Sequence, residues 1–189
     1  MSDSTLYDLL ERLANLLRGE LRQAGARFNL QPVHLEVLHY LSRCNRYSDT
    51  PAGVAEFLGL TKGTVSQSLL VLENKGFLVR RLDEDDQRKQ HLLLTRRGSS
   101  LLQGVLPPTP LLDAALNLPA DQAHALMPAL RALLRGMQQY NERRIFGTCR
   151  GCRHLTQTGE GLRCGLTQDP LSAGDTQLIC REYSSRAAG

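Results

Sequence analysis

The chain has 189 residues, of which 41% are hydrophobic, and a formal net charge of +4. This length suits one domain with an appendage and allows a well-buried core. The mild positive charge permits nucleic-acid binding without requiring it, because a local basic patch matters more than the total. No apolar run is long enough to cross a membrane, and no signal-peptide pattern begins the chain, so we expect a cytoplasmic protein with reduced thiols.

The first predicted element is a long helix within residues 1–30. Leucines recur along one face of it, and so wide an apolar stripe must be buried against other residues. The stripe comprises Leu6, Leu9, Leu10, Leu13, Leu16, Leu17 and Leu21. It can pack within its own chain or against a second subunit.

Two shorter helices are predicted before residue 60. Pro32 is placed for the first turn of one helix, and Thr50-Pro51 begins the other, which Gly59 ends. Cys44 lies near the end of the first of them, beside apolar residues. In that position a small buried side chain is more usual than a reactive thiol.

The next segment predicts a helix with one polar face. Thr61 can cap it, while Val65, Leu69 and Leu72 share one face and Gly76 stands where a helix favours a left-handed stop. The solvent face near its start carries Lys62, Thr64, Ser66 and Gln67. Short polar side chains with one cation suit base edges and phosphates.

A hairpin is predicted directly after this helix. Two β-prone runs, residues 77–82 and 91–95, flank a charged segment that places Arg88 and Lys89 at the turn. A recognition helix followed by a basic hairpin is a winged helix-turn-helix. The predicted fold class is therefore mainly α with a small β-wing (α+β).

Two motifs in this region have a fixed spacing. Asp86-Gln87-Arg88 is followed after five residues by Leu94-Thr95. The helix carries Leu60, Thr61, Thr64, Val65, Ser66, Leu72, Glu73, Gly76 and Phe77. Together they resemble the wing signature and recognition helix of the MarR family of bacterial transcription regulators, and the similarity extends from about Leu6 to Phe146. Gln67 departs from the Arg of many members, and Gly63 from the usual Ser or Pro.

The resemblance implies a homodimer that binds a palindromic double-stranded DNA operator, and not an enzyme. It implies that residues 31–98 form the DNA-binding domain, while residues 1–30 and 99–146 supply a helical dimerisation layer. The implied DNA contacts are Thr61, Lys62, Gly63, Thr64, Ser66, Gln67, Arg88, Lys89 and Gln90. The last helix of the layer is predicted to open after Pro119 and to be kinked or divided by Pro128.

Residues 147–189 hold four of the five cysteines, spaced Cys149-x2-Cys152-x11-Cys164-x15-Cys180. A segment this small and poor in aliphatic residues cannot bury enough surface to fold by itself and needs a stabilising cross-link. In a reducing compartment that cross-link is a metal held by thiolates.

Two metal centres fit the four cysteines. Structural zinc takes four thiolates, usually from two CxxC pairs, but fifteen residues separate Cys164 from Cys180. A [4Fe–4S] cluster accepts one close pair with two scattered partners and is the preferred prediction, with Zn²⁺ as the alternative and metal-free redox thiols as a third. His154 is a bystander or a donor to a ligand. Weak similarity to small iron–sulfur modules lies in residues 149–152 and 178–183.

Three functions follow from these elements. In the preferred one, a redox-sensitive cluster alters operator affinity by acting through residues 143–146 on the last dimerisation helix. In the second, zinc stabilises residues 147–189 and a small-molecule ligand binds between the dimerisation and DNA-binding parts. In the third, residues 147–189 are an electron-transfer or enzymatic module on a winged-helix scaffold.

Overall fold

The computed structural model describes residues 3–84, 86–140, 144–159 and 161–186. Its helices are α1 (Asp3–Ala26), α2 (Pro32–Leu41), α3 (Pro51–Leu58), α4 (Lys62–Asn74), α5 (Arg96–Val105), α6 (Thr109–Leu116) and α7 (Ala120–Tyr140). Strands β1 (Leu78–Leu82) and β2 (Gln90–Leu94) form the wing. The expectation of a mainly helical protein with a small antiparallel wing is confirmed.

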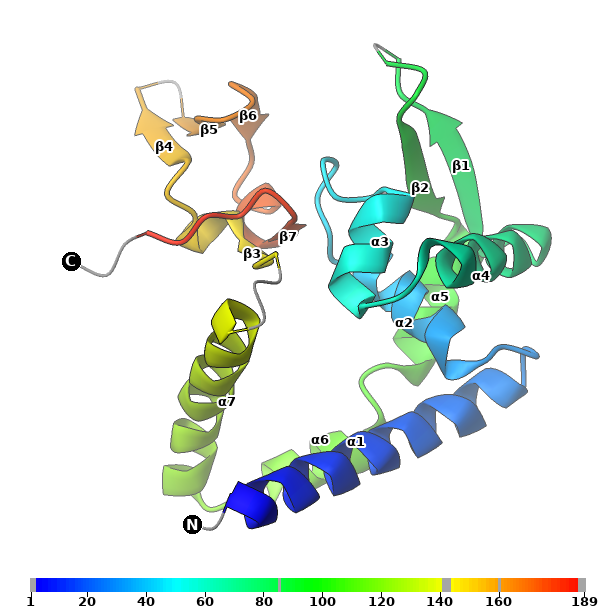
Figure 1. The fold of residues 1–189 in the computed structure, drawn as a ribbon, viewed down its shortest axis with the longest axis vertical. Coiled ribbons are helices and arrows are strands. Elements are labelled where there is room, and N and C mark those ends of the chain that lie inside the picture. Colours follow the sequence, from blue (N-terminus) through cyan, green and yellow to red (C-terminus); the bar gives the residue numbers. More distant parts are fainter. Residues whose placement is uncertain (1–2, 85, 141–143, 160, 187–189) are drawn as a thin grey trace.

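The winged helix is built around one apolar core. α2, α3 and α4 surround side chains such as Leu38, Val54 and Leu69, none of which is more than 1% exposed. The predicted helix ends are present, since Gly59 and Gly76 adopt positive φ angles of 65° and 71°. This core holds α4 with its polar face outward (Figure 1).

α6 and α7 lie away from this core, whereas the C-terminal half of α1 packs against it through Leu21 and Ala24. α1 runs beneath the winged helix with α6 beside its N-terminal part, and α7 rises from that end toward the C-terminal segment (Figure 1). α7 continues through Pro128 as one helix, so of the two predicted outcomes, a kink or a division, the division does not occur. A proline removes one backbone hydrogen bond, and the turns on either side of it maintain the helix.

Residues 147–186 form two small sheets joined by short turns. β3 (Gly147–Thr148) pairs with β7 (Ile179–Cys180), and β5 (Gly161–Cys164) lies between β4 (Leu155–Thr158) and β6 (Pro170–Leu171). The 3-10 turns are Cys149–Gly151 and Asp175–Gln177. Figure 1 shows this unit, hereafter the tail, beside α3.

The tail is docked on the winged helix itself. The Ile179 N–H donates to Arg43 O at 2.7 Å, and the Ile179 carbonyl accepts from the Asn45 N–H at 2.9 Å. The Ile179 side chain joins the core of the winged helix. Phe146 packs on Phe57 of α3, with ring centroids 5.2 Å apart. The sequence had suggested a link through the last helix alone, and Arg143 at the start of that link lies outside the described residues.

Candidate nucleic-acid interface and cysteine pocket

The N-terminal end of α4 presents the predicted polar surface. Thr61 caps the helix by accepting the Thr64 N–H at 3.1 Å, and the two hydroxyls lie 2.9 Å apart. The predicted contact residues on this helix are all exposed: Thr61, Lys62, Gly63, Thr64, Ser66 and Gln67. Their backbones are fixed because Val65, Leu69 and Leu72 are buried beneath them. A rigid polar face of this kind can enter a major groove.

The wing tip holds its arginine in a defined position. Asp86 Oδ1 accepts from both the backbone N–H and Nε of Arg88, each at 3.1 Å. The Arg88 side chain is 93% exposed. Lys89 is also exposed, with Nζ 3.9 Å from Asp86 Oδ2. Asp86 therefore orients the Arg88 side chain in the structure.

Gln90 differs from the other predicted contacts. It lies in β2 opposite Leu82 and not at the tip, and its side-chain oxygen accepts from Arg80 at 3.3 Å. It is only partly exposed. The β-propensity of the following residues had placed the start of the return strand one residue too late.

A partly buried polar bridge joins the wing to the rest of the domain. His91 Nδ1 lies 2.6 Å from Asp49 Oδ1, and His91 Nε2 lies 2.9 Å from Asp83 Oδ2. Hydrogen bonds to Asp83 and Asp49 raise the pKa of His91, while burial raises the pKa of Asp49 despite its bond to His91. Sequence reasoning missed this bridge because its ends are 42 residues apart.

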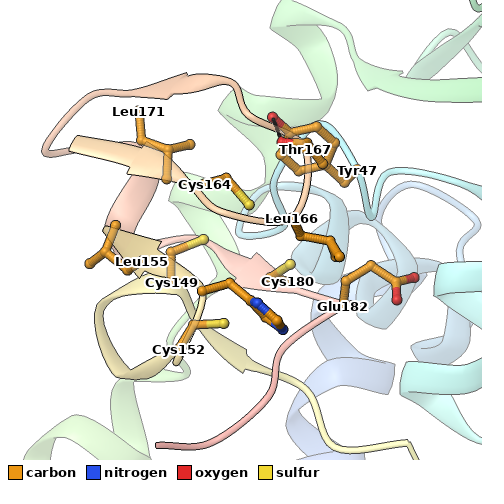
Figure 2. Close-up of a pocket in the computed structure, with 11 residues that line it drawn as sticks. Tyr47, Cys149, Cys152, Leu155, Cys164, Leu166, Thr167, Leu171, Cys180 and Glu182 are labelled. Carbon is orange, nitrogen blue, oxygen red and sulfur yellow. Dashed lines mark hydrogen bonds between the residues drawn. The ribbon is translucent and has the colours of Figure 1, made fainter. Parts of the chain in front are cut away.

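The four tail cysteines line one pocket. The first 3-10 turn carries Cys149 and is followed by Cys152, while β5 carries Cys164 and β7 carries Cys180. Figure 2 shows the four sulfurs directed into the same space. His154, Tyr47 and Glu182 also line it. Cys164 is half-buried, and the other three cysteines are buried. Folding thus brings together all four residues that the spacing had singled out.

The thiols of this pocket differ in their readiness to ionise. A hydrogen bond between Cys149 and Cys180 raises the pKa of Cys149 and lowers that of Cys180. A thiolate is therefore favoured at Cys180, and thiolates are the form that binds metals. In contrast, burial raises the pKa of Cys44 to about 12. Cys44 is thus a buried structural thiol in the helical domain, as the sequence indicated.

The four cysteines around one pocket are the donor set that either predicted metal centre requires. Structural zinc is held by four thiolates in a tetrahedron with Zn–S bonds of about 2.3 Å, and a [4Fe–4S] cluster is also held by four cysteine thiolates. Within the described part of the chain, no three or more His, Cys, Asp or Glu side chains are gathered closely enough to hold one ion.

The winged helix contributes to the pocket through residues that the sequence did not flag. Asn45 Nδ2 donates to Cys149 Sγ at 3.9 Å. Tyr47 donates its hydroxyl to Asp169 of the tail. Arg181, which follows Cys180 in the chain, donates two hydrogen bonds to the Glu56 carboxylate of α3, at 2.6 and 2.7 Å. Only the folded chain brings these segments together.

Comparison with known proteins identifies the winged helix. Residues 28–89 match the sequence model of the MarR family. None of the curated protein sequences compared with the chain shows a significant match. Proteins of the MarR family are transcriptional regulators and not enzymes, which agrees with the prediction of a non-enzymatic protein.

Several solved structures share this fold, among them a MarR transcriptional regulator. One from Methanosarcina mazei Go1 is 15% identical, with a TM-score of 0.63 over 73% of this chain and 99% of its own. Streptococcus pneumoniae FabT in complex with DNA is 22% identical, with a TM-score of 0.61 over 74% and 99%. The S. aureus MepR–DNA complex is 22% identical, with a TM-score of 0.56 over 72% and 98%. At these identities the similarity establishes the fold.

Among the helices in the described ranges, none combines the length and the apolar character needed to span a membrane.

Proposed function

We propose that this chain is a MarR-type regulator of transcription that acts in the cytoplasm as a homodimer on a palindromic DNA operator. The observation that carries the proposal is the exposed face of α4 together with the oriented Arg88 at the wing tip. A helix face of short polar side chains suits the major groove, and an exposed arginine on a wing suits a narrow minor groove. FabT and MepR, which have the same fold, were solved bound to DNA.

The homodimer is supported by apolar surface that one chain leaves uncovered. Leu9, Leu13 and Leu16 of α1 are more than half exposed, and α7 exposes Leu134 and Met137 to a similar degree. Monomeric proteins rarely leave so much contiguous apolar surface in water. A second copy of the same helices would cover it and set two recognition helices on successive half-sites.

The tail is proposed to hold a [4Fe–4S] cluster through Cys149, Cys152, Cys164 and Cys180. The support is the shared pocket and the favoured thiolate at Cys180. When bound, such a group supplies a redox-sensitive centre. The chain itself supplies the ligands, a hydrogen bond from Asn45 and a largely buried setting, which are the features by which proteins tune cluster potential.

The test begins with protein purified without oxygen. The purified protein should contain iron and acid-labile sulfide and show a broad visible absorption band. The Cys152→Ser variant should lose the iron, the sulfide and the band. Cys44→Ser is the matched control and should retain them, because Cys44 belongs to the helical core. Stoichiometric zinc without iron would assign the pocket to the structural alternative.

DNA binding is tested with the operator selected from a randomised duplex library. Holo-protein, air-exposed protein and Cys152→Ser should differ in operator affinity by at least tenfold, which corresponds to a coupling of about 1.4 kcal/mol. Equal operator affinities of these three proteins would show that the tail has a structural role only. Failure to select any sequence would contradict the DNA-binding function itself.

A second candidate is regulation by a small molecule, with zinc in the tail. A large pocket between α1, α2 and α5 favours it, lined by apolar residues such as Leu17 and Leu102 and by His39 and Arg43. Apolar walls with a few polar groups are typical of ligand sites. Small-molecule-dependent loss of operator binding by the Cys152→Ser variant would support this route independently of the cysteines.

A further inference from the structure

The loop between α2 and α3, residues 42–50, touches both the cysteine pocket and the wing. At the pocket, Asn45 is 4% exposed and donates its side-chain amide to Cys149 Sγ at 3.9 Å. Its backbone N–H donates to Ile179 O at 2.9 Å. Asn45 is therefore in direct contact with a cysteine of the pocket and with the strand that carries Cys180, so a displacement of either reaches it.

The other end of the Asn45 side chain is held within the loop. Its Oδ1 accepts from Ser48 Oγ at 2.7 Å and from the Tyr47 N–H at 3.2 Å. Ser48 is fully buried, and its Oγ accepts the Arg181 N–H at 2.8 Å while its carbonyl accepts the Tyr40 hydroxyl at 2.8 Å. Since these groups are buried and already paired, a shift of Asn45 must move Ser48 or leave a polar atom unsatisfied.

The residue after Ser48 carries the connection to the wing. The Asp49 carbonyl accepts the Leu92 N–H of β2 at 2.7 Å, and its carboxylate bonds His91 at 2.6 Å. His91 in turn bonds Asp83, whose other oxygen accepts the Asp86 N–H at 2.8 Å. Asp86 holds Arg88. An unbroken series of hydrogen bonds and one peptide bond therefore runs from Cys149 to the DNA-facing arginine.

We propose that a change at the cysteine pocket reaches the wing through Asn45, Ser48, Asp49 and His91, within one chain, and not through α7. This deepens the regulatory role proposed for the pocket and rests on it. The pocket state positions Asn45, and the loop transmits that position to β2 and the wing tip. Regulation would then act on the minor-groove contact in each subunit separately.

The test is a double-mutant cycle read by hydrogen exchange in peptides covering residues 83–94 of the full chain. It is done without DNA on protein purified without oxygen. Cys149→Ser should speed exchange in these peptides roughly two- to tenfold, the range expected for losing one hydrogen-bonded support. In a His91→Gln background the same change should have less than a twofold effect, because the last link is already broken.

Two matched controls separate this route from its rivals. Cys164→Ser alters the same pocket on β5 and should leave the wing peptides within twofold of the parent. Insertion of Gly-Gly-Ser after Tyr140 slackens the connection to α7, and the effect of Cys149→Ser should survive it. If circular dichroism shows that Cys149→Ser disrupts the folding of the tail, Asn45→Asp replaces it. This substitution keeps the shape of the Asn45 side chain and removes its N–H donor.

The outcomes are distinct. Faster exchange that Cys149→Ser causes when His91 is present, and that is absent in the His91→Gln background, supports the proposal. Equal increases in both backgrounds, or no increase in either, overturn it. Loss of the effect on slackening the α7 connection would assign the route to the dimerisation helices. Because this exchange is measured without operator and does not depend on which metal the pocket holds, its failure is separate from failure of the iron, sulfide and DNA-binding tests.

Discussion

Single side chains on the surface proposed to face DNA are positioned by contacts within the chain. Arg88 is the clearest case, because Asp86 holds its Nε at 3.1 Å while the guanidinium stays exposed. A preorganised contact loses less conformational freedom on binding. Arg88→Ala should weaken operator binding by about 1–3 kcal/mol, measured by mobility-shift titration at fixed salt. Arg150→Ala, an exposed arginine of the tail, should change affinity far less.

Lys62 and Gln67 are expected to play different parts on the same helix. Lys62 lies in the first turn of α4 and should meet phosphate, whereas Gln67 can pair with adenine in the major groove. Lys62→Ala should weaken binding to all sequences alike and lower the salt slope by about one. Gln67→Ala should relax preference at one position per half-site in a randomised library. Uniform losses for both variants would contradict the role given to Gln67.

His91 makes the wing sensitive to pH. Its pKa in the folded chain is raised by Asp83 and Asp49, so it lies above the unfolded value of about 6.5. The resulting stabilisation is complete below the unfolded pKa and is lost as pH rises through the raised folded pKa. The difference in free energy of unfolding between wild type and His91→Gln should therefore shrink with rising pH in denaturant titrations. A difference that grows above neutral pH would refute this assignment.

At the level of elements, Glu56 of α3 forms a charged contact with Arg181 of the tail and lies 3.5 Å from Arg144 before it. Arg181 bonds both oxygens of Glu56, and the Arg181 side chain is only 24% exposed. Glu56→Gln removes the charge with little change in shape. It should cost about 1 kcal/mol, since the pair is partly screened by solvent, and should speed hydrogen exchange in residues 178–183. Glu11→Gln on α1 is the control and should leave those residues unchanged.

For the whole molecule, the uncovered faces of α1 and α7 predict the mode of assembly. Leu13 and Leu16 are exposed, whereas Leu17 lines the pocket beside α5. Replacing Leu13 and Leu16 with Glu should give monomers, because charges are not tolerated in a buried apolar seam. Light scattering measures the result. A soluble dimer of unchanged mass would place the interface elsewhere.

The sequence by itself determined the elements and the kind of surface they present. Periodicity, caps and turn residues are local signals, so α4, its cap at Thr61 and its left-handed end at Gly76 could be predicted from neighbours in the chain. The position of Arg88 beside Asp86 is equally local. The cysteine spacing likewise identified the four residues that share the pocket.

Only the tertiary structure decided what the tail touches. Asn45 and Cys149 are 104 residues apart, and Arg181 and Glu56 are 125 apart. Nothing local to either partner indicates such a pair, because its energy depends on how the intervening chain packs. The same holds for the bridge from Asp49 through His91 to Asp83. Docking of the tail on the α2–α3 loop, and with it a path from cysteines to wing, is therefore a property of the fold.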